Sequence, residues 1–232
     1  MIELMGISRY YRDGREKIAV LESVNLRIQQ GEFVSILGPS GSGKSTLLTI
    51  LGLLDKPDTG TYLLSGEDVT RYGDGKLAAI RNRYIGFVFQ QFMLIPRLTV
   101  GENVALPLQY APLSGRERRR QVDEALEQVG MLARKKELPT NLSGGQKQKV
   151  AIARAIVASP SLLLADEPTG NLDIDSKREI VSILKRLNGQ GHTIVLVTHD
   201  TELAEIADRI LYVRNRTLVP YGEAAVKGAG LG

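Results

Sequence analysis

The chain has 232 residues, 43% of them hydrophobic, with 30 basic and 26 acidic side chains and a net charge of +4. This composition excludes whole-chain disorder and fibrous repeats, and the length suits one large domain or two small ones. The chain has no cysteine, which excludes disulfides, thiolate zinc sites, iron–sulfur clusters and cysteine nucleophiles. No run approaches the roughly 18 consecutive apolar residues of a membrane span. We therefore expect any membrane crossing in its function to be made by another chain.

Five apolar segments predict strands. Residues 24–29 alternate apolar and polar, as a half-exposed antiparallel strand does. Residues 33–37 form a short, nearly continuous apolar run before a glycine, which is typical of a buried central strand. The same pattern recurs at residues 85–89, 162–165 and 193–197.

Helical patterns lie between these strands, at residues 46–54, 122–129, 150–157 and 180–187. Two more helix starts are marked by Ser/Thr-x-x-Glu spacing, one from Thr99 to Glu102 and one from Ser114 to Glu117. Strands that alternate with helices predict an α/β protein with a parallel core.

The domain organisation is inferred from a long stretch of the chain that has no strand pattern. The stretch 99–158 is helix-rich without a clear strand, which predicts a helical subdomain inserted in the core of a single domain over residues 1–222. The small, glycine-rich residues 223–232 are expected to form a flexible tail.

Residues 38–45 read Gly-Pro-Ser-Gly-Ser-Gly-Lys-Ser and fit the phosphate-binding pattern G-x-x-x-x-G-K-[ST]. The glycines let backbone amides curl around phosphate oxygens, and the following helix adds its positive end. We expect Lys44 to reach the β- and γ-phosphates and the Ser45 hydroxyl to ligate Mg²⁺. A glycine-rich turn that binds nothing is disfavoured, because the buried strand before the loop and the helix after it are in register.

Asp166 and Glu167 follow the apolar run at residues 162–165. A P-loop needs a carboxylate for its metal, so Asp166 is expected to hold Mg²⁺ through water. Glu167 is then placed to orient and deprotonate the attacking water. Alone, such a pair is usually a solvated strand end, and its meaning comes from the P-loop in the same chain.

The run Leu142-Ser143-Gly144-Gly145-Gln146 decides the family. Together with residues 38–45 and 162–167 it resembles the motifs of the ATP-binding subunits of ABC transporters, and the likeness extends over nearly the whole chain. The resemblance implies a P-loop NTPase core with a mainly parallel sheet, an N-terminal antiparallel β-subdomain and an inserted α-helical subdomain. It also implies ATP hydrolysis, with ATP and Mg²⁺ as cofactors.

The resemblance also gives roles to single residues. Tyr11 is similar to the aromatic residue that stacks on adenine, and Gln90 to the Q-loop glutamine that touches Mg²⁺ and the water. Asp173 matches the D-loop, and His199 the switch histidine that senses the γ-phosphate. The implied catalytic set is Glu167, His199, Gln90 and Lys44, and the implied metal set is Ser45, Gln90 and Asp166. The implied ATP-binding set is Tyr11, Gly38, Pro39, Ser40, Gly41, Ser42, Gly43, Lys44, Ser45, Thr46, Gln90 and His199, with Ser143, Gly144, Gly145 and Gln146 from a second subunit.

The signature run also has a physical interpretation of its own. Ser143 and two glycines open a helix from about Gln146 to Val157, and its free amides form an anion site without a lysine. In the family this site is completed by a second subunit, so the resemblance implies a head-to-tail dimer around two ATP molecules. It further implies integral membrane permease subunits, which would hold the chain at the cytoplasmic face of the inner membrane.

The segment Gln91-Phe92-Met93-Leu94-Ile95-Pro96 is a strongly apolar loop. One interpretation is packing against the helical subdomain. The other, implied by the family, is a groove around Gln91, Phe92, Met93 and Leu94 that receives a coupling helix of the permease. Both interpretations stay open, and each can hold for different side chains.

Residues 52–57, 80–90 and 96–104 resemble one branch of the family, the macrolide-exporter and lipoprotein-release (MacB/LolD-like) ATPases. Such ATPases drive membrane subunits that export or extract a drug, peptide, lipoprotein or haem. Lys147 departs from the glutamine that is usual in this branch. The alternative is a regulatory, FtsE-like ATPase that signals across the membrane without transport.

A nucleic-acid-associated ABC ATPase is the less favoured interpretation. Those proteins generally carry a long coiled coil or zinc cysteines between the P-loop and the signature, whereas only 99 positions separate Lys44 from Ser143 here. The basic cluster Arg116, Arg118, Arg119 and Arg120 is interpreted as a solvated helix face. No nucleic-acid partner is expected.

Overall fold

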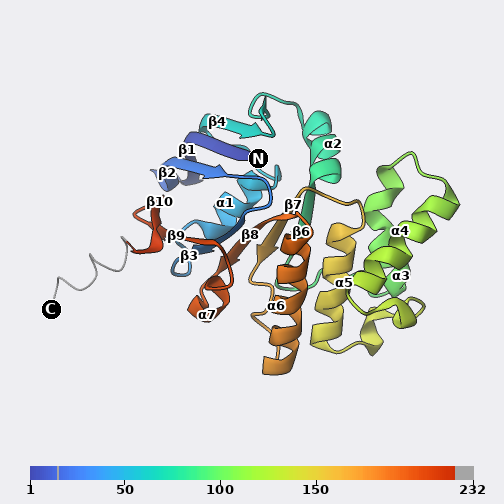
Figure 1. Ribbon diagram of the computed structural model, residues 1–232. Coiled ribbons are helices and arrows are strands. Elements are labelled where there is room, and N and C mark those ends of the chain that lie inside the picture. Colours follow the sequence, from blue (N-terminus) through green and yellow to red (C-terminus); the bar gives the residue numbers. More distant parts are fainter. Residues whose placement is uncertain (15, 223–232) are drawn as a thin grey trace. The chain divides into compact units, whose positions relative to one another are not determined.

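The computed structural model describes residues 1–14 and 16–222 (Figure 1). The chain divides into two compact units, one made of residues 1–78 with the described residues from 195 onward, and one made of residues 79–194. The expected flexible tail, residues 223–232, lies outside the described residues, and the single domain over residues 1–222 stays a prediction.

The first unit contains a four-stranded antiparallel sheet with the order β2-β1-β4-β5. Its strands are β1 (Ile2–Asp13), β2 (Glu16–Ile28), β4 (Thr59–Leu64) and β5 (Glu67–Asp68). Buried and exposed residues alternate from Val24 to Ile28, as the sequence predicts, because one face of β2 covers the core. The strand begins at Glu16, earlier than predicted, since β1 pairs with it over nearly its whole length.

A second group of strands in the first unit carries the phosphate-binding turn. The buried strand β3 (Phe33–Leu37) pairs in parallel with β9 (Arg209–Arg214), and β9 pairs antiparallel with β10 (Thr217–Pro220). Helix α1 (Lys44–Leu51) follows β3, and the short α7 (Thr201–Ala204) precedes β9. The pairing of β3 with β9 therefore fixes the strand from which the turn leaves.

The second unit pairs β6 (Ile85–Val88) in parallel with β7 (Leu162–Asp166). Its longer helices are α3 (Val100–Ala105), α4 (Gly115–Gln128), α5 (Gly144–Ile156) and α6 (Ile174–Gly189), and its 3₁₀ turns are η1 (Leu106–Tyr110), η2 (Leu132–Arg134) and η3 (Pro139–Asn141). Residues 99–158, all of them described, contain no strand, as predicted. Two elements join the units along the chain, α2 (Asp74–Tyr84) and β8 (Thr193–Thr198).

Both predicted capping boxes are present. Thr99 caps α3 with Glu102, and Ser114 caps α4 with Glu117, each through reciprocal hydrogen bonds. The pKa of each glutamate lies below its usual range because the cap residue donates to the carboxylate, chiefly from the backbone of Thr99 and from the side chain of Ser114. A cap of this kind contributes about 1 kcal/mol. Within the described part of the chain, no helix combines the length and the apolar character needed to cross a membrane.

Candidate functional site

The predicted phosphate-binding residues form the turn between β3 and α1. Helix α1 begins at Lys44, two residues before its predicted start, with Gly43 as its N-cap in a left-handed conformation (φ 101°). A Cβ on Gly43 would lie 2.8 Å from the backbone oxygen of Val20, so this position accepts only glycine. The Lys44 Nζ donates to the carbonyl oxygens of Gly38 and Pro39, at 2.7 and 2.8 Å. The lysine ammonium is thereby held beside the first turn of the helix.

This turn fits an anion. The first amides of α1 have no acceptor within the helix, and the helix dipole adds positive potential there. The Ser42 Oγ is buried and has no hydrogen-bond partner among the described residues, so it can accept from or donate to a ligand. Ser45 is exposed in the first turn of α1, and a hydroxyl oxygen is a ligand type that Mg²⁺ accepts.

A cavity of about 780 Å³ opens beside the turn in the first unit. It is lined by Ile18, Ala19 and Val20 of β2, by Pro39, Gly41 and Ser42 of the turn, and by Tyr212, Val213, Arg214, Asn215, Arg216 and Tyr221. Its volume is in the range of small-molecule sites. The lining residues of the turn were predicted from the sequence, whereas those between 212 and 221 were not, because strands β9 and β10 carry no recognisable motif.

Tyr11 does not line this cavity. It lies opposite Ile18, a lining residue, in the β1–β2 register, and its side chain is 44% exposed. The Arg9 guanidinium carbon lies 5.1 Å from its ring centroid. Its predicted contact with adenine stays a prediction.

The predicted carboxylates lie in the second unit, at the end of β7. Asp166 is the last residue of the strand and is half-buried. Glu167 follows with φ 45°, a left-handed conformation that costs a non-glycine residue about 1–2 kcal/mol. Strain of this kind clusters at functional sites. Gln90 approaches the same loop, because a Cβ on Gly170 would lie 2.9 Å from the Gln90 Nε2.

Residues 143–146 begin α5. Ser143 is the N-cap and forms a capping box with Gln146, which the sequence analysis did not predict. Gly144 and Gly145 are the first two helical residues, so the helix starts two residues earlier than expected and their amides have no acceptor within it. The beginning of α5 thus presents free amides of the kind that can bind an anion, and these four residues contain no lysine.

Two further predicted residues flank helices. Asp173 is the N-cap of α6, and its pKa is lowered because the Ser176 amide and then the Ser176 hydroxyl donate to it. His199, in the first unit, follows β8 and is exposed, and the next residue, Asp200, caps α7.

Comparisons with known proteins decide the family. The family model described as ABC transporter matches residues 21–170. An uncharacterized ABC transporter ATP-binding protein of Bacillus subtilis (strain 168), YknY, is 53% identical over 220 residues, which cover 95% of this chain and 96% of YknY. The chain belongs to the ABC transporter family. It is a cassette that binds and hydrolyses ATP, as the sequence predicts.

Other relatives agree with the predicted branch and fold. The macrolide export ATP-binding/permease protein MacB of Chlorobaculum tepidum is 49% identical over 94% of this chain, which corresponds to 34% of MacB. The ATP-binding cassette MJ0796, solved as a dimer bound to ADP and Pi, superposes with a TM-score of 0.87 at 44% identity, over 95% of this chain and 98% of that one. A second dimeric structure of MJ0796, described as a bacterial ABC transporter cassette, gives the same TM-score at 46% identity. The ABC-ATPase fold is confirmed.

Two side chains of the cassette that sequence reasoning missed hold the segment around Gln90. Gln148 of α5 is fully buried, and its Nε2 donates to the carbonyl of Phe89 at 3.4 Å. Arg154, also on α5, donates to the carbonyls of Phe92 and Met93. Burial lowers the pKa of the Arg154 guanidinium. In the sequence, Gln148 and Arg154 look like the polar face of an amphipathic helix, so no local signal identifies them.

The apolar loop after Gln90 contains one packed and one exposed large side chain. Phe92 is half-buried, and its ring lies 3.8 Å from where a Cβ on Gly144 would be. Met93 is 58% exposed. Phe92 therefore packs on the signature helix, whereas Met93 does not pack in this way, and the permease contact stays a prediction.

Proposed function

We propose that two copies of this cassette close head to tail around two ATP molecules, and that closing and reopening drive membrane subunits of the MacB/LolD type. The observation that supports this most directly is the pair of anion-type helix starts in one chain. The start of α1 has Lys44, and the start of α5 has two glycine amides and no lysine. In the proposed dimer, the free amides at the start of α5 bind the γ-phosphate of the ATP that the other copy holds. The dimeric state of MJ0796 with ADP and Pi supports the same arrangement.

The proposed chemistry is positioning and electrostatic stabilisation. Lys44 binds the β- and γ-phosphates, and the cavity beside the P-loop takes part of the nucleoside. Glu167 orients the attacking water and accepts its proton, while His199 holds the γ-phosphate. Ser45, Gln90 and Asp166 offer the oxygen ligands that suit Mg²⁺, which would neutralise phosphate charge when bound.

We propose that the permease contacts the exposed part of residues 91–94, with Met93 as its apolar centre. This contact would hold the chain at the cytoplasmic face of the membrane. The similarity to MacB supports an exporter or extractor of a drug, peptide, lipoprotein or haem.

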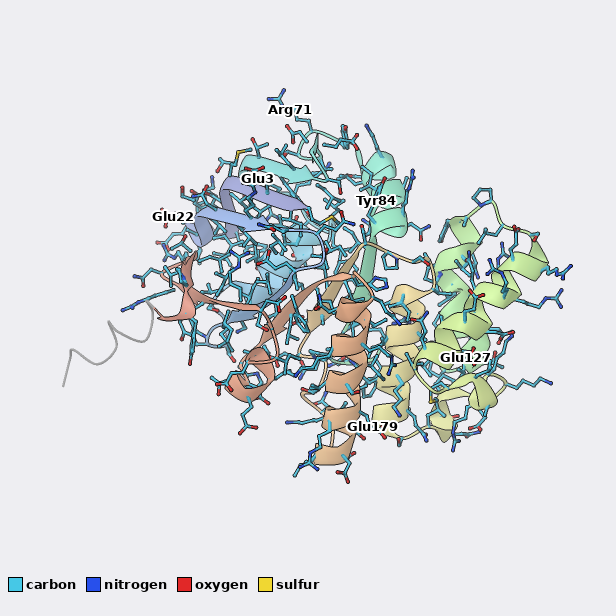
Figure 2. All side chains as sticks on the ribbon, viewed as in Figure 1. Glu3, Glu22, Arg71, Tyr84, Glu127 and Glu179 are labelled. Carbon is cyan, nitrogen blue, oxygen red and sulfur yellow. The ribbon has the colours of Figure 1, made fainter. Side chains whose placement is uncertain are left out.

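The test of hydrolysis and dimerisation uses the full chain with Glu167→Gln. We expect this variant to bind ATP, to lose turnover by at least about 100-fold, and to elute as a dimer only when ATP and Mg²⁺ are present. The matched control is Glu127→Gln, an exposed residue of α4 (Figure 2), which should turn over ATP like the wild type. Fast turnover by Glu167→Gln would remove Glu167 from its role. A monomer at saturating ATP would remove the proposed dimer.

The test of the transport role is to tag the chain, solubilise native membranes in mild detergent with ATP, and identify the copurifying proteins by mass spectrometry. We expect a roughly stoichiometric membrane protein with few spans and a large extracytoplasmic domain. Recovery with DNA or ribosomes and no membrane protein would overturn the transport role and leave the ATPase chemistry in place.

A further inference from the structure

The first turns of α5 and α6 lie in direct contact at Gly145 and Ser176. A Cβ placed on Gly145 would lie 2.3 Å from the Ser176 Oγ and 2.8 Å from the Ser176 Cβ. Real Cβ atoms do not approach other atoms so closely, so the second residue of α5 has to be glycine while Ser176 keeps its place. Glycine is therefore required at position 145 by a contact with α6 of the same chain, and not only by a bound ligand.

Ser176 also donates two hydrogen bonds to the side chain of the D-loop aspartate. Its backbone N–H donates to the Asp173 Oδ1 at 2.9 Å, and its hydroxyl donates to the Asp173 Oδ2 at 2.8 Å. One serine therefore contacts the signature glycine with its side chain and fixes the carboxylate that begins α6.

A second contact one turn further along sets the register of the two helices. Lys149 of α5 and Glu179 of α6, the second of them labelled in Figure 2, form an ion pair with Nζ and Oε2 2.7 Å apart. The lysine side chain is only 19% exposed. Gly145 to Lys149 and Ser176 to Glu179 are each about one helical turn. The two helices thus start together and run side by side in the same direction (Figure 1).

We infer that Ser176 is a positioning residue that keeps the signature motif and the D-loop in one fixed relative place. This inference rests on the proposed dimer, in which residues 143–146 meet the nucleotide of the other copy. If α5 and α6 moved separately, closing would bring the signature amides to the phosphate without fixing Asp173. Because Ser176 contacts both, the signature amides and Asp173 reach the nucleotide of the other copy in a fixed relative position.

The first experiment asks which side of Gly145 requires glycine. In the full chain we expect Gly145→Ala to lower ATP turnover by at least about 100-fold, because the new methyl displaces Ser176 and shifts the signature amides. Adding Ser176→Gly removes the Oγ and the Cβ and leaves the Ser176 Cα, 3.7 Å from the new methyl, at an ordinary van der Waals distance. Turnover should then recover at least fivefold. The matched control adds Ser182→Gly, an exposed position of α6, which carries the same cost of a helical glycine and should give no recovery.

The possible outcomes separate clearly. Recovery with Ser176→Gly but not with Ser182→Gly supports the inference. A double variant as inactive as Gly145→Ala alone overturns it, because glycine is then required by the ligand on the opposite side. Wild-type turnover by Gly145→Ala overturns it as well.

The second experiment stays informative even where Gly145→Ala fails to fold. Ser176→Ala keeps the Cβ and removes only the hydroxyl bond to Asp173. We expect kcat to fall about three- to tenfold, with the ATP Kd of the monomer unchanged within twofold. In a Glu167→Gln background the ATP-dependent dimer should dissociate at a several-fold higher protein concentration. An unchanged kcat and an unchanged dimer affinity overturn the positioning role.

Failure of the proposed function would give a different experimental result. A wild-type chain that hydrolyses ATP without ever dimerising overturns the proposed dimer and, with it, the role of Ser176 in the dimer. The contact itself would still be measurable as non-additive unfolding free energies of the Gly145 and Ser176 variants.

Discussion

The Arg154 guanidinium holds the backbone carbonyl of Phe92, with the Nη2 2.8 Å from the oxygen, and a second bond reaches the carbonyl of Met93. Both acceptor residues are left-handed, with φ 52° and 49°. Each such conformation costs a non-glycine residue about 1–2 kcal/mol. Hydrogen bonds to a charged group contribute about 1.5–3 kcal/mol, enough to offset that strain. Arg154 therefore fixes the shape of the loop that we propose as the permease contact.

Arg154→Lys should lower the free energy of unfolding by about 1–3 kcal/mol, because one ammonium cannot reproduce the fork that reaches two carbonyls. Urea denaturation measures this, and amide hydrogen exchange of residues 92–95 should speed up. The control Arg178→Lys changes a side chain that is 79% exposed and should stay within about 0.5 kcal/mol of the wild type. Unchanged exchange in the loop would contradict the anchoring role.

The two left-handed glycines of the P-loop should respond differently to alanine. Gly41 has φ 76° and open space where a Cβ would be, so Gly41→Ala meets only backbone strain, about 1–2 kcal/mol. At Gly43 the Cβ would also overlap the Val20 oxygen, and the unfolding free energy should fall by a further 1–3 kcal/mol or so. Denaturation without nucleotide tests this difference. Equal costs would show that β2 moves away from the turn.

The central strands and the P-loop were predictable because their signals are local. Residues 33–37 and 162–165 are continuous or nearly continuous apolar runs. The spacing of Gly38, Gly43 and Lys44 is recognisable because a loop that wraps around a phosphate needs these residue types at fixed positions. The capping boxes at Thr99 and Ser114 were predictable for the same reason, since both partners lie within one turn.

The features that were missed have no local signal in the sequence. Strand β1 has register shifts between Leu4 and Ile7 and between Ile7 and Arg9, and these interrupt the alternation that would identify a strand. Helix α2 buries only Leu77, so it has no apolar stripe. The left-handed backbone of Glu167 follows from tertiary structure and has no sequence signal.

Tyr62 links β4 to the end of the P-loop helix. Its side chain is buried, and its hydroxyl donates to the Leu51 carbonyl at 2.8 Å, which satisfies one of the last acceptors of α1. Burial raises the pKa of this phenol far above its usual value, so it stays a donor at all physiological pH values. Tyr62→Phe should cost about 1–2 kcal/mol in unfolding free energy and leave the fold unchanged. As a control, Tyr110→Phe changes a residue that is 83% exposed and should cost almost nothing. Equal stability of both variants would show that the Leu51 carbonyl finds another donor.

Asp58 gives the first unit a pH dependence below about pH 4. Its carboxylate accepts from the Tyr10 backbone N–H at 2.8 Å and from Arg9, which also stacks on Tyr11. These contacts, the Tyr10 bond first, lower the pKa of Asp58 below its usual value of 3.8.

Because the pKa of Asp58 is lower in the folded state, its stabilisation is present above about pH 4 and is lost as the pH falls through the folded pKa. At pH 7, Asp58→Asn should be less stable than the wild type by about 0.5–1 kcal/mol, and this difference should shrink toward zero between pH 4 and about pH 2. Urea denaturation across this range measures it. The control Asp175→Asn removes a carboxylate that is 92% exposed and should differ from the wild type by less than about 0.5 kcal/mol at each pH. A constant deficit for Asp58→Asn from pH 7 to pH 2 would show that its carboxylate acts through shape and not through charge.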